Sequence, residues 1–337
     1  MNWEDLLTEF RALGGVADNV AIRQGPLGRG VFPVDPAKPV RLRAPPNLLV
    51  PSADTELREG RLVVKASSNL GDGERKFFDR YQQEFLWGAG TLDEMWQAQL
   101  RWTELPENVQ EKLKDTGSVL ADRFAEPEAA LCHRRYLETR QFRYLGTSVL
   151  MPMVELVNHS DDAVKFDTSN GIGVECTSSD EVRVDYGPDD CWTMAMTYGF
   201  CSARPRAYSL GAIFAFEGLD IHVSRKFTQR KRINGVPVPQ VDVEKNKVDF
   251  SFVMLGNIRD PKIPRTAFLH AAKTTPIKQP DELFDMIQHY NLIRLVEFLR
   301  VSDGLSQPLA VMLRGAAYRQ LEALSAHFGR RALEGNS

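Results

Sequence analysis

The stretch LMPMVELVNHSDDAVKF, residues 150–166, joins an apolar run to a polar end. Its Met, Val and Leu residues lead directly into Asn158 and His159, and a turn rich in acids follows. Buried Asn and His side chains cost free energy unless they are hydrogen-bonded. A pair in this place therefore belongs either to a satisfied structural network or to a ligand site, and this segment alone favours the structural interpretation.

Two further interpretations of the same segment are weaker. A metal site built from His159, Asp161 and Asp162 is disfavoured, because neighbours in sequence seldom converge on one ion and no second histidine is near. A catalytic pair of Ser160 and His159 is disfavoured because adjacent side chains of an extended chain point to opposite faces. We therefore expect no metal site here.

The composition is typical of a soluble globular protein of about two domains. Its 42 Lys and Arg nearly balance 45 Asp and Glu, and the net charge of -3 provides no broad field for binding nucleic acid. Apolar runs are shorter than the roughly 20 residues of a membrane span and the first residues are acidic, so we expect no membrane partner and a cytoplasmic location. No long heptad pattern is present, which favours a monomer.

The four cysteines, Cys132, Cys176, Cys191 and Cys201, have no C-x-x-C spacing and no nearby histidine pair. Neither a zinc site nor a disulfide framework is therefore indicated, and reduced structural thiols are expected.

A basic run follows further along the chain, with members Arg225, Lys226, Arg230, Lys231 and Arg232. It is interpreted as a solvated face, with docking of an acidic region of a protein substrate as the alternative.

Hydrophobic periodicity divides the chain into strand-rich and helix-rich parts. Residues 2–13 predict an amphipathic helix, and short apolar runs cut by Gly and Pro predict strands from 20 to 65. A helical insertion is predicted at about 75–144, after which short strands return. The last third predicts a hairpin around residues 244–247 and helices at about 281–302 and 308–330. We place the domain boundary near residue 204, giving domains 1–204 and 205–337.

Two other segments carry residues that suggest a ligand site. GPLGRGVF, residues 25–32, contains closely spaced glycines, but the chain continues into VFPVDPAKPV, whose prolines are incompatible with the helix of a dinucleotide-binding turn. A glycine turn between two strands is the favoured interpretation. EVRVDYGPDDCWTMAMTYGF, residues 181–200, contains Tyr186-Gly187 and Tyr198-Gly199, and either tyrosine alone would be interpreted as a core residue.

The order and spacing of all three segments resemble a SET domain, the β-fold of protein lysine methyltransferases, in the subclass of the Rubisco large-subunit lysine methyltransferase. That family has a glycine turn, strands, a helical insertion, a strand leading to Asn-His, and two Tyr-Gly motifs. The resemblance covers about residues 2–201. It implies an α+β fold, in which short strands with a helical insertion are followed by a mostly helical C-terminal lobe that binds substrate.

The resemblance also implies roles for individual residues. Tyr186 corresponds to the tyrosine regarded as catalytic, and Tyr198 to the one that closes the pocket. Phe166 and Trp192 are candidate walls of a substrate channel, together with Tyr198. The cofactor is implied to be S-adenosyl-L-methionine (AdoMet). Its implied binding residues are Leu27, Gly28, Arg29, Gly30, Arg140, Glu155, Asn158, His159, Tyr186 and Tyr198.

Methyl transfer from a sulfonium to an amine requires nucleophile, methyl and sulfur on one axis, and such orientation contributes on the order of 7 to 11 kcal/mol. A lysine amine must also lose its proton, which a narrow apolar channel favours. The implied function is therefore AdoMet-dependent methylation of a lysine on a protein substrate, without a metal. The alternatives are methylation of a protein histidine, whose imidazole is largely neutral already, and a non-catalytic module that retains the fold.

Overall fold

The computed structural model describes residues 2–116, 129–187, 189–202, 204–225, 232–233 and 236–334, with the side chains of 232–233, 236–237 and 327–334 excepted. It divides into two compact units. Unit 1 comprises Met1–Leu100 and Glu126–Gly187, and unit 2 comprises Arg101–Ala125 and Pro188–Ser337. This division differs from the expected boundary near residue 204, because part of the helical insertion and the second Tyr-Gly motif belong to unit 2.

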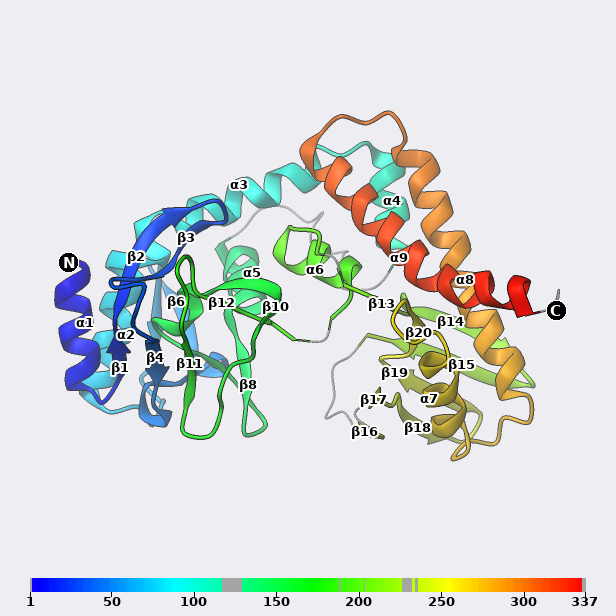
Figure 1. The fold of residues 1–337 in the computed structure, drawn as a ribbon, viewed down its shortest axis with the longest axis horizontal. Helices are drawn as coiled ribbons and strands as arrows, with labels where there is room; N and C mark the ends of the chain where they lie inside the picture. Colours follow the sequence, from blue (N-terminus) through cyan, green and yellow to red (C-terminus); the bar gives the residue numbers. More distant parts are fainter. Residues whose placement is uncertain are drawn as a thin grey trace. The chain divides into compact units, whose positions relative to one another are not determined.

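Unit 1 (blue to green in Figure 1) is built from short strands and four helices or parts of helices in its described residues. The helices are α1 (Trp3–Ala12), α2 (Asp72–Phe85), α3 (Thr91–Thr103, which continues into unit 2) and α5 (Ala129–Arg140). The strands are β1 (Val16–Asp18), β2 (Val20–Gly25), β3 (Gly28–Pro33), β4 (Val40–Ala44), β5 (Val50–Pro51), β6 (Thr55–Arg58), β7 (Arg61–Val64), β8 (Phe142–Tyr144), β9 (Thr147–Leu150), β10 (Asn158–Val164), β11 (Ile172–Cys176) and β12 (Arg183–Val184).

Small sheets, rather than one large sheet, organise unit 1. The sheets have the strand orders β1-β4-β11, β5-β9-β8, β2-β3, β6-β7 and β10-β12, and only the β10-β12 pair is parallel among these described strands. Helix α1 begins where the Asn2 side chain caps it by accepting a hydrogen bond from the amide of Asp5. Leu6, Leu7 and Phe10 on its apolar stripe are buried in the core of unit 1.

Helix α2 separates two apolar clusters of unit 1. Phe77 and Tyr81 contribute to the cluster that includes α1, whereas Phe78 contributes to a second cluster with Trp87 and Tyr136. Burying an aromatic side chain removes a large apolar area from water, on the order of 150–250 Å² each. The helix therefore contributes aromatic side chains to both apolar clusters of unit 1.

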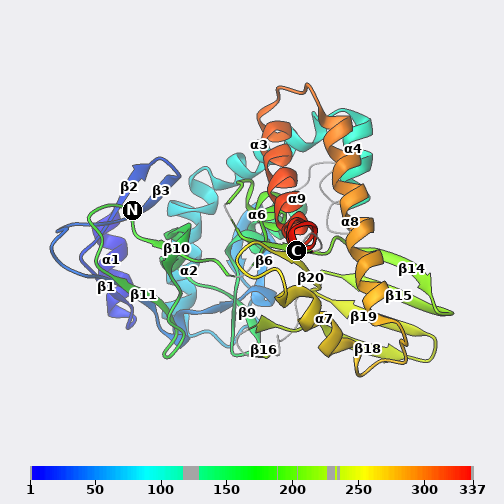
Figure 2. The same ribbon diagram turned by 45° about the vertical axis from the view of Figure 1, so that its right-hand side comes forward.

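Unit 2 combines a mixed sheet with helices. Its helices are α4 (Glu107–Lys114), α6 (Cys191–Tyr198), α7 (Ile263–Ala272), α8 (Pro280–Ser302) and α9 (Pro308–Glu334). Its strands are β13 (Arg206–Tyr208), β14 (Ala212–Phe216), β15 (Leu219–Ser224), β16 (Arg232–Ile233), β17 (Val236–Pro237), β18 (Gln240–Glu244), β19 (Lys247–Ser251) and β20 (Met254–Asn257). The largest sheet has the order β14-β15-β19-β18, and α8 and α9 lie side by side in both views (Figures 1 and 2).

A buried carboxylate joins four segments of unit 2. Asp190 caps α6, accepts hydrogen bonds from the amide of Tyr208 and the side chain of Gln320, and forms an ion pair with Arg225. Arg225 lies 2.8 Å from the carboxylate, which corrects the interpretation of this arginine as part of a solvated face. Lys226, Arg230 and Lys231 of that basic run lie outside the described residues, and the side chain of Arg232 does too.

The α+β class is confirmed. The predicted N-terminal helix, the early strands and the helices at 281–302 and 308–330 are confirmed, as is the hairpin, with β18 and β19 on either side of its turn. The C-terminal part contains α7, α8 and α9 as expected of a helical lobe, and also the four-stranded sheet. None of the helices in the described ranges has the length and apolarity that crossing a membrane requires.

Candidate functional site

The parallel pair of β10 and β12 brings the Asn-His and first Tyr-Gly motifs together in unit 1 (Figure 1). Asn158 pairs with Arg183, and His159 with Val184. Upstream, Met153 has φ 72° and ψ -44°, close to the strained γ-turn, and the chain then makes a 3₁₀ turn at Val154–Leu156. After this reversal Asn158 is half-buried and His159 is buried.

Asn158 is held by both hydrogens of its amide group. Its Nδ2 lies 2.5 Å from Oε1 of Glu181 and 3.3 Å from the carbonyl oxygen of Arg29. The amide oxygen Oδ1 is consequently the atom of this side chain that can accept a hydrogen bond from a ligand. The segment 150–166 thus contains an asparagine whose amide nitrogen is hydrogen-bonded and whose amide oxygen can accept a hydrogen bond.

Glu181 was not predicted, and it connects three segments of the site. Its side chain is 1% exposed, and its Oε2 accepts hydrogen bonds from Nε and Nη2 of Arg183 at 3.0 and 2.9 Å. Gly30 lies against the same carboxylate, since a Cβ atom there would stand 2.2 Å from Glu181 Oε1 and 2.8 Å from Asn158 Nδ2. Glycine at position 30 is therefore required for the β2-β3 hairpin to approach Asn158 this closely.

His159 is buried and bonded on both ring nitrogens. Its Nε2 lies 2.9 Å from Oδ1 of Asp161, and its Nδ1 lies 3.2 Å from the backbone nitrogen of Tyr186 and 3.1 Å from the carbonyl oxygen of Val184. With the proton on Nε2, the ring donates to Asp161 and accepts from the Tyr186 amide, and the Val184 carbonyl is then a neighbour of Nδ1 without a hydrogen bond to it. His159 therefore positions the backbone that carries Tyr186.

Tyr186 is directed into the unit by these contacts. Its hydroxyl donates a hydrogen bond to the carbonyl oxygen of Val157 at 2.9 Å, and its ring centroid lies 5.0 Å from that of His159. Burial raises the pKa of Tyr186 to about 12, so the hydroxyl keeps its proton near neutral pH. This residue can orient a neighbouring group but is not suited to remove a proton from it.

Arg140 and Glu155 form a buried polar cluster with residues of α2 and α5. Burial raises the pKa of Glu155 to about 7, although Arg140, Tyr81 and Gln82 each lower it. Neither carboxylate oxygen accepts a hydrogen bond in standard geometry, and Nε of Arg140 and Nε2 of Gln82 also lack partners. Burial lowers the pKa of Arg140, but Tyr136, Glu155 and other neighbours raise it more, so its pKa is raised overall.

Only Leu27 of the predicted turn Leu27 to Gly30 lies at the tip of the β2-β3 hairpin, because Gly25 pairs with Gly28 and β3 begins at Gly28. Gly28 has φ +94°, a conformation that favours glycine, and the Leu27 side chain is exposed. Arg29 donates to the carbonyl oxygen of Phe85 at 3.0 Å and lies over its ring, which anchors the hairpin to the end of α2.

The remaining predicted residues do not all join this cluster. Phe166 packs edge-to-face on Phe142 at 5.4 Å between centroids, at the edge of the core of unit 1. Trp192 is 1% exposed in the core of unit 2, edge-to-face with Phe298, and its place in a channel wall stays a prediction. Tyr198 is the last residue of α6 in unit 2, and its role in closing the pocket stays a prediction.

Among the described side chains, no three His, Cys, Asp or Glu residues come together as ligands of a metal ion would. The residues that contact one another at the site are an asparagine, a histidine, carboxylates, two arginines and a tyrosine. Such groups recognise polar organic ligands through hydrogen bonds and charge.

Solved structures resemble the chain over nearly all of its length at low identity. The SET domain of LSMT bound to lysine and AdoHcy is 13% identical, with 98% of this chain and 91% of that chain covered and a TM-score of 0.44. Rubisco LSMT bound to AdoMet is 14% identical, with 98% and 92% covered and a TM-score of 0.46. Rubisco LSMT bound to sinefungin and monomethyllysine is 15% identical, with the same coverage and a TM-score of 0.45.

No protein-family model and no curated protein sequence matches the chain. Similarity at the level of these structures does not assign an activity. The function of this protein must therefore be inferred from its own residues.

Proposed function

We propose that this protein is an AdoMet-dependent methyltransferase that methylates a lysine side chain of a protein substrate. One observation carries the proposal: Asn158, His159 and Tyr186 meet at the β10-β12 pair, with Gly30 against them. These residues come from the three segments, in the same order, on which the resemblance to SET-domain lysine methyltransferases rests.

The polar groups of unit 1 fit the polar groups of AdoMet, which has a carboxylate, an ammonium and an adenine amino group. Arg140 is a buried cation with an unpartnered Nε, which suits a carboxylate. Asn158 offers Oδ1 as an acceptor, which suits an amino group. When bound here, AdoMet would supply an electrophilic methyl group on its sulfonium.

Tyr186 would orient the nucleophile rather than activate it as a base. Its hydroxyl donates to the Val157 carbonyl, and its pKa of about 12 disfavours the tyrosinate form near pH 7. The hydroxyl oxygen can still accept a hydrogen bond from an amine or weak contacts from a polarised methyl group. Orientation of this kind contributes on the order of 7 to 11 kcal/mol to catalysis.

The lysine amine would lose its proton because of its surroundings. A free lysine has a pKa of about 10.4, so deprotonation at pH 7 costs roughly 4.6 kcal/mol. Leu156, Val157 and Val184, which border the site residues, are buried apolar side chains. Apolar surroundings disfavour the ammonium form and lower this cost.

The proposal is tested with isotope-labelled AdoMet and a cell lysate, followed by mass spectrometry of labelled proteins. We expect labelled methyl groups on lysine, with the Tyr186→Phe variant reduced by at least about tenfold, because the amine loses its orienting hydroxyl. Tyr144→Phe is the matched control, since that hydroxyl accepts from the backbone of Gly171 elsewhere in unit 1. Undiminished transfer by Tyr186→Phe would remove Tyr186 from the mechanism.

The same experiment decides between the proposal and its alternatives. A label found on histidine would replace lysine as the target residue, because imidazole needs less depression of its pKa to be neutral. AdoMet binding without transfer to any protein would favour a binding module that retains the fold.

A further inference from the structure

Two cysteines of unit 2 lie unusually close together. Sγ of Cys191 is 2.8 Å from Sγ of Cys201, against about 2.0 Å for a covalent disulfide. A movement of under about 1 Å would bring the two sulfurs to bonding distance. Both cysteines are thiols in this structure, in which Cys191 is buried and Cys201 is partly exposed.

The path of the chain explains why they meet. Helix α6 begins at Cys191 and ends at Tyr198, and at 1.5 Å per residue it advances about 10 Å. Gly199 then adopts the left-handed conformation, with φ 79°. Cys201 comes three residues after Tyr198, and its sulfur lies beside that of Cys191 at the start of the helix. The segment Tyr198-Gly199-Phe200 therefore folds back along α6.

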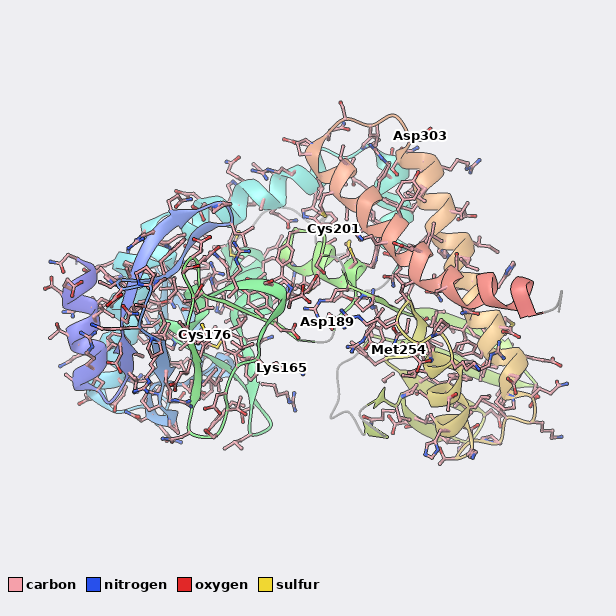
Figure 3. The ribbon with its side chains drawn as sticks, viewed as in Figure 1. Lys165, Cys176, Asp189, Cys201, Met254 and Asp303 are labelled. Atoms are coloured by element: carbon pink, nitrogen blue, oxygen red, sulfur yellow. The ribbon has the colours of Figure 1, made fainter. Side chains whose placement is uncertain are left out.

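We propose that Cys191 and Cys201 form an oxidative modification site, at which a peroxide converts the two thiols to a disulfide. The crosslink would close a ring that contains Tyr198 and Phe200, whose own rings lie 5.9 Å apart. Figure 3 labels Cys201 beside α6 and Cys176 in unit 1, the latter outside the proposed pair. This inference does not depend on the proposed methyltransferase activity.

The chemistry balances with hydrogen peroxide as oxidant. The Cys201 sulfur, the more exposed of the two, attacks one peroxide oxygen, the O–O bond breaks, and one water leaves, giving a sulfenic acid. Cys191 then attacks the Cys201 sulfur, the S–S bond forms, the S–O bond breaks, and the departing hydroxide takes the Cys191 proton as a second water. Two thiols are oxidised and one peroxide is reduced.

The position of Cys191 suits it to the second step, because its sulfur already lies in contact with that of Cys201. The hydrogen bond to Cys201 and burial raise the pKa of the Cys191 thiol above its ordinary value. A buried thiol of this kind reacts slowly with a reagent from solution. It can react with a sulfenic acid that is already in contact, because no diffusion is then required.

The test is peroxide treatment of the reduced full-length protein, followed by mass spectrometry under non-reducing conditions. We expect a loss of about 2 Da and a linked peptide pair containing Cys191 and Cys201, reversed by dithiothreitol. Cys132 and Cys176 are internal controls, which should remain thiols. Amide hydrogen exchange at residues 198–200 should slow on oxidation and recover on reduction, because the crosslink removes local opening.

Two variants identify the order of steps. In Cys191→Ser, Cys201 should accumulate as a sulfenic acid that a dimedone probe captures, whereas the wild type should give little adduct. In Cys201→Ser, neither crosslink nor oxidation of Cys191 is expected. A wild-type protein that gives sulfinic acid at Cys201 instead of the crosslink, or a disulfide between different cysteines, would overturn the proposal.

Discussion

Replacing Glu155 with Gln should change how the stability of unit 1 depends on pH. Burial raises the pKa of Glu155 to about 7 in the folded protein, against 4.5 for the ordinary carboxyl group. Since the folded pKa is the higher one, the folded state binds more protons than the unfolded state between these values. The contribution of Glu155 to stability is therefore full below about pH 4.5 and is lost as the pH rises through 7.

The size of this effect follows from the two pKa values. The difference between these two pKa values corresponds to about 3 kcal/mol in full. Between about pH 5 and pH 8, the wild type should lose roughly 2 to 3 kcal/mol of this contribution. Glutamine has the same shape and does not titrate, so the Glu155→Gln variant should lose none of it.

The assay measures the free energy of unfolding of unit 1 in urea, for both proteins and at several pH values. Limited proteolysis reports unfolding of unit 1, because the peptides quantified come from α2 and α5. Tyr81→Phe is the matched control, because it alters the same cluster and keeps the titrating carboxyl group. Equal pH dependence in wild type and Glu155→Gln would refute the assignment of a raised pKa to this buried carboxyl.

Three further substitutions test contacts of the site and of unit 2. Glu181→Gln weakens the charge-assisted hydrogen bond that fixes Asn158, so calorimetry should give AdoMet binding about tenfold weaker, with unchanged affinity contradicting a positioning role. Gly30→Ala places a methyl group 2.2 Å from the Glu181 carboxylate, so AdoMet affinity should fall at least about tenfold, and wild-type affinity would mean that the hairpin can move aside. Arg225→Met leaves the buried Asp190 charge without its cation, and urea unfolding should show unit 2 destabilised by about 3 kcal/mol. The loss is no larger because the other hydrogen-bond donors to Asp190 remain. A loss below about 1 kcal/mol would refute this role of Arg225.

Local patterns predicted the parts of the fold that depend on neighbours in sequence. The stripe of Leu6, Leu7 and Phe10 has helical spacing, and the β18-β19 hairpin has strand character on both sides of a polar turn. The Asn-His and Tyr-Gly motifs were likewise visible, because each is contiguous in the chain.

Contacts between distant segments could not be predicted in the same way. In sequence, Glu181 is one acid among several beside a turn, and it becomes buried only because β3, β10 and β12 converge on it. The cluster of Glu155 with Tyr81 and Gln82 spans more than 70 residues, and it too requires the tertiary fold.

Trp192 has a local signal for packing that is visible in the sequence. The helix that carries it also contains buried Met194, Ala195 and Met196, and it is therefore apolar on most sides. A helix of that composition is typical of a core.

Calorimetric titration of the purified protein with AdoMet tests the central claim most directly. We expect a dissociation constant in the micromolar range, about -8 kcal/mol, that becomes at least about tenfold weaker in Asn158→Ala, because the acceptor Oδ1 is lost. Asn170→Ala, an exposed asparagine of the same unit, should bind like the wild type. No binding at about millimolar AdoMet, or equal affinity in Asn158→Ala, would contradict the account.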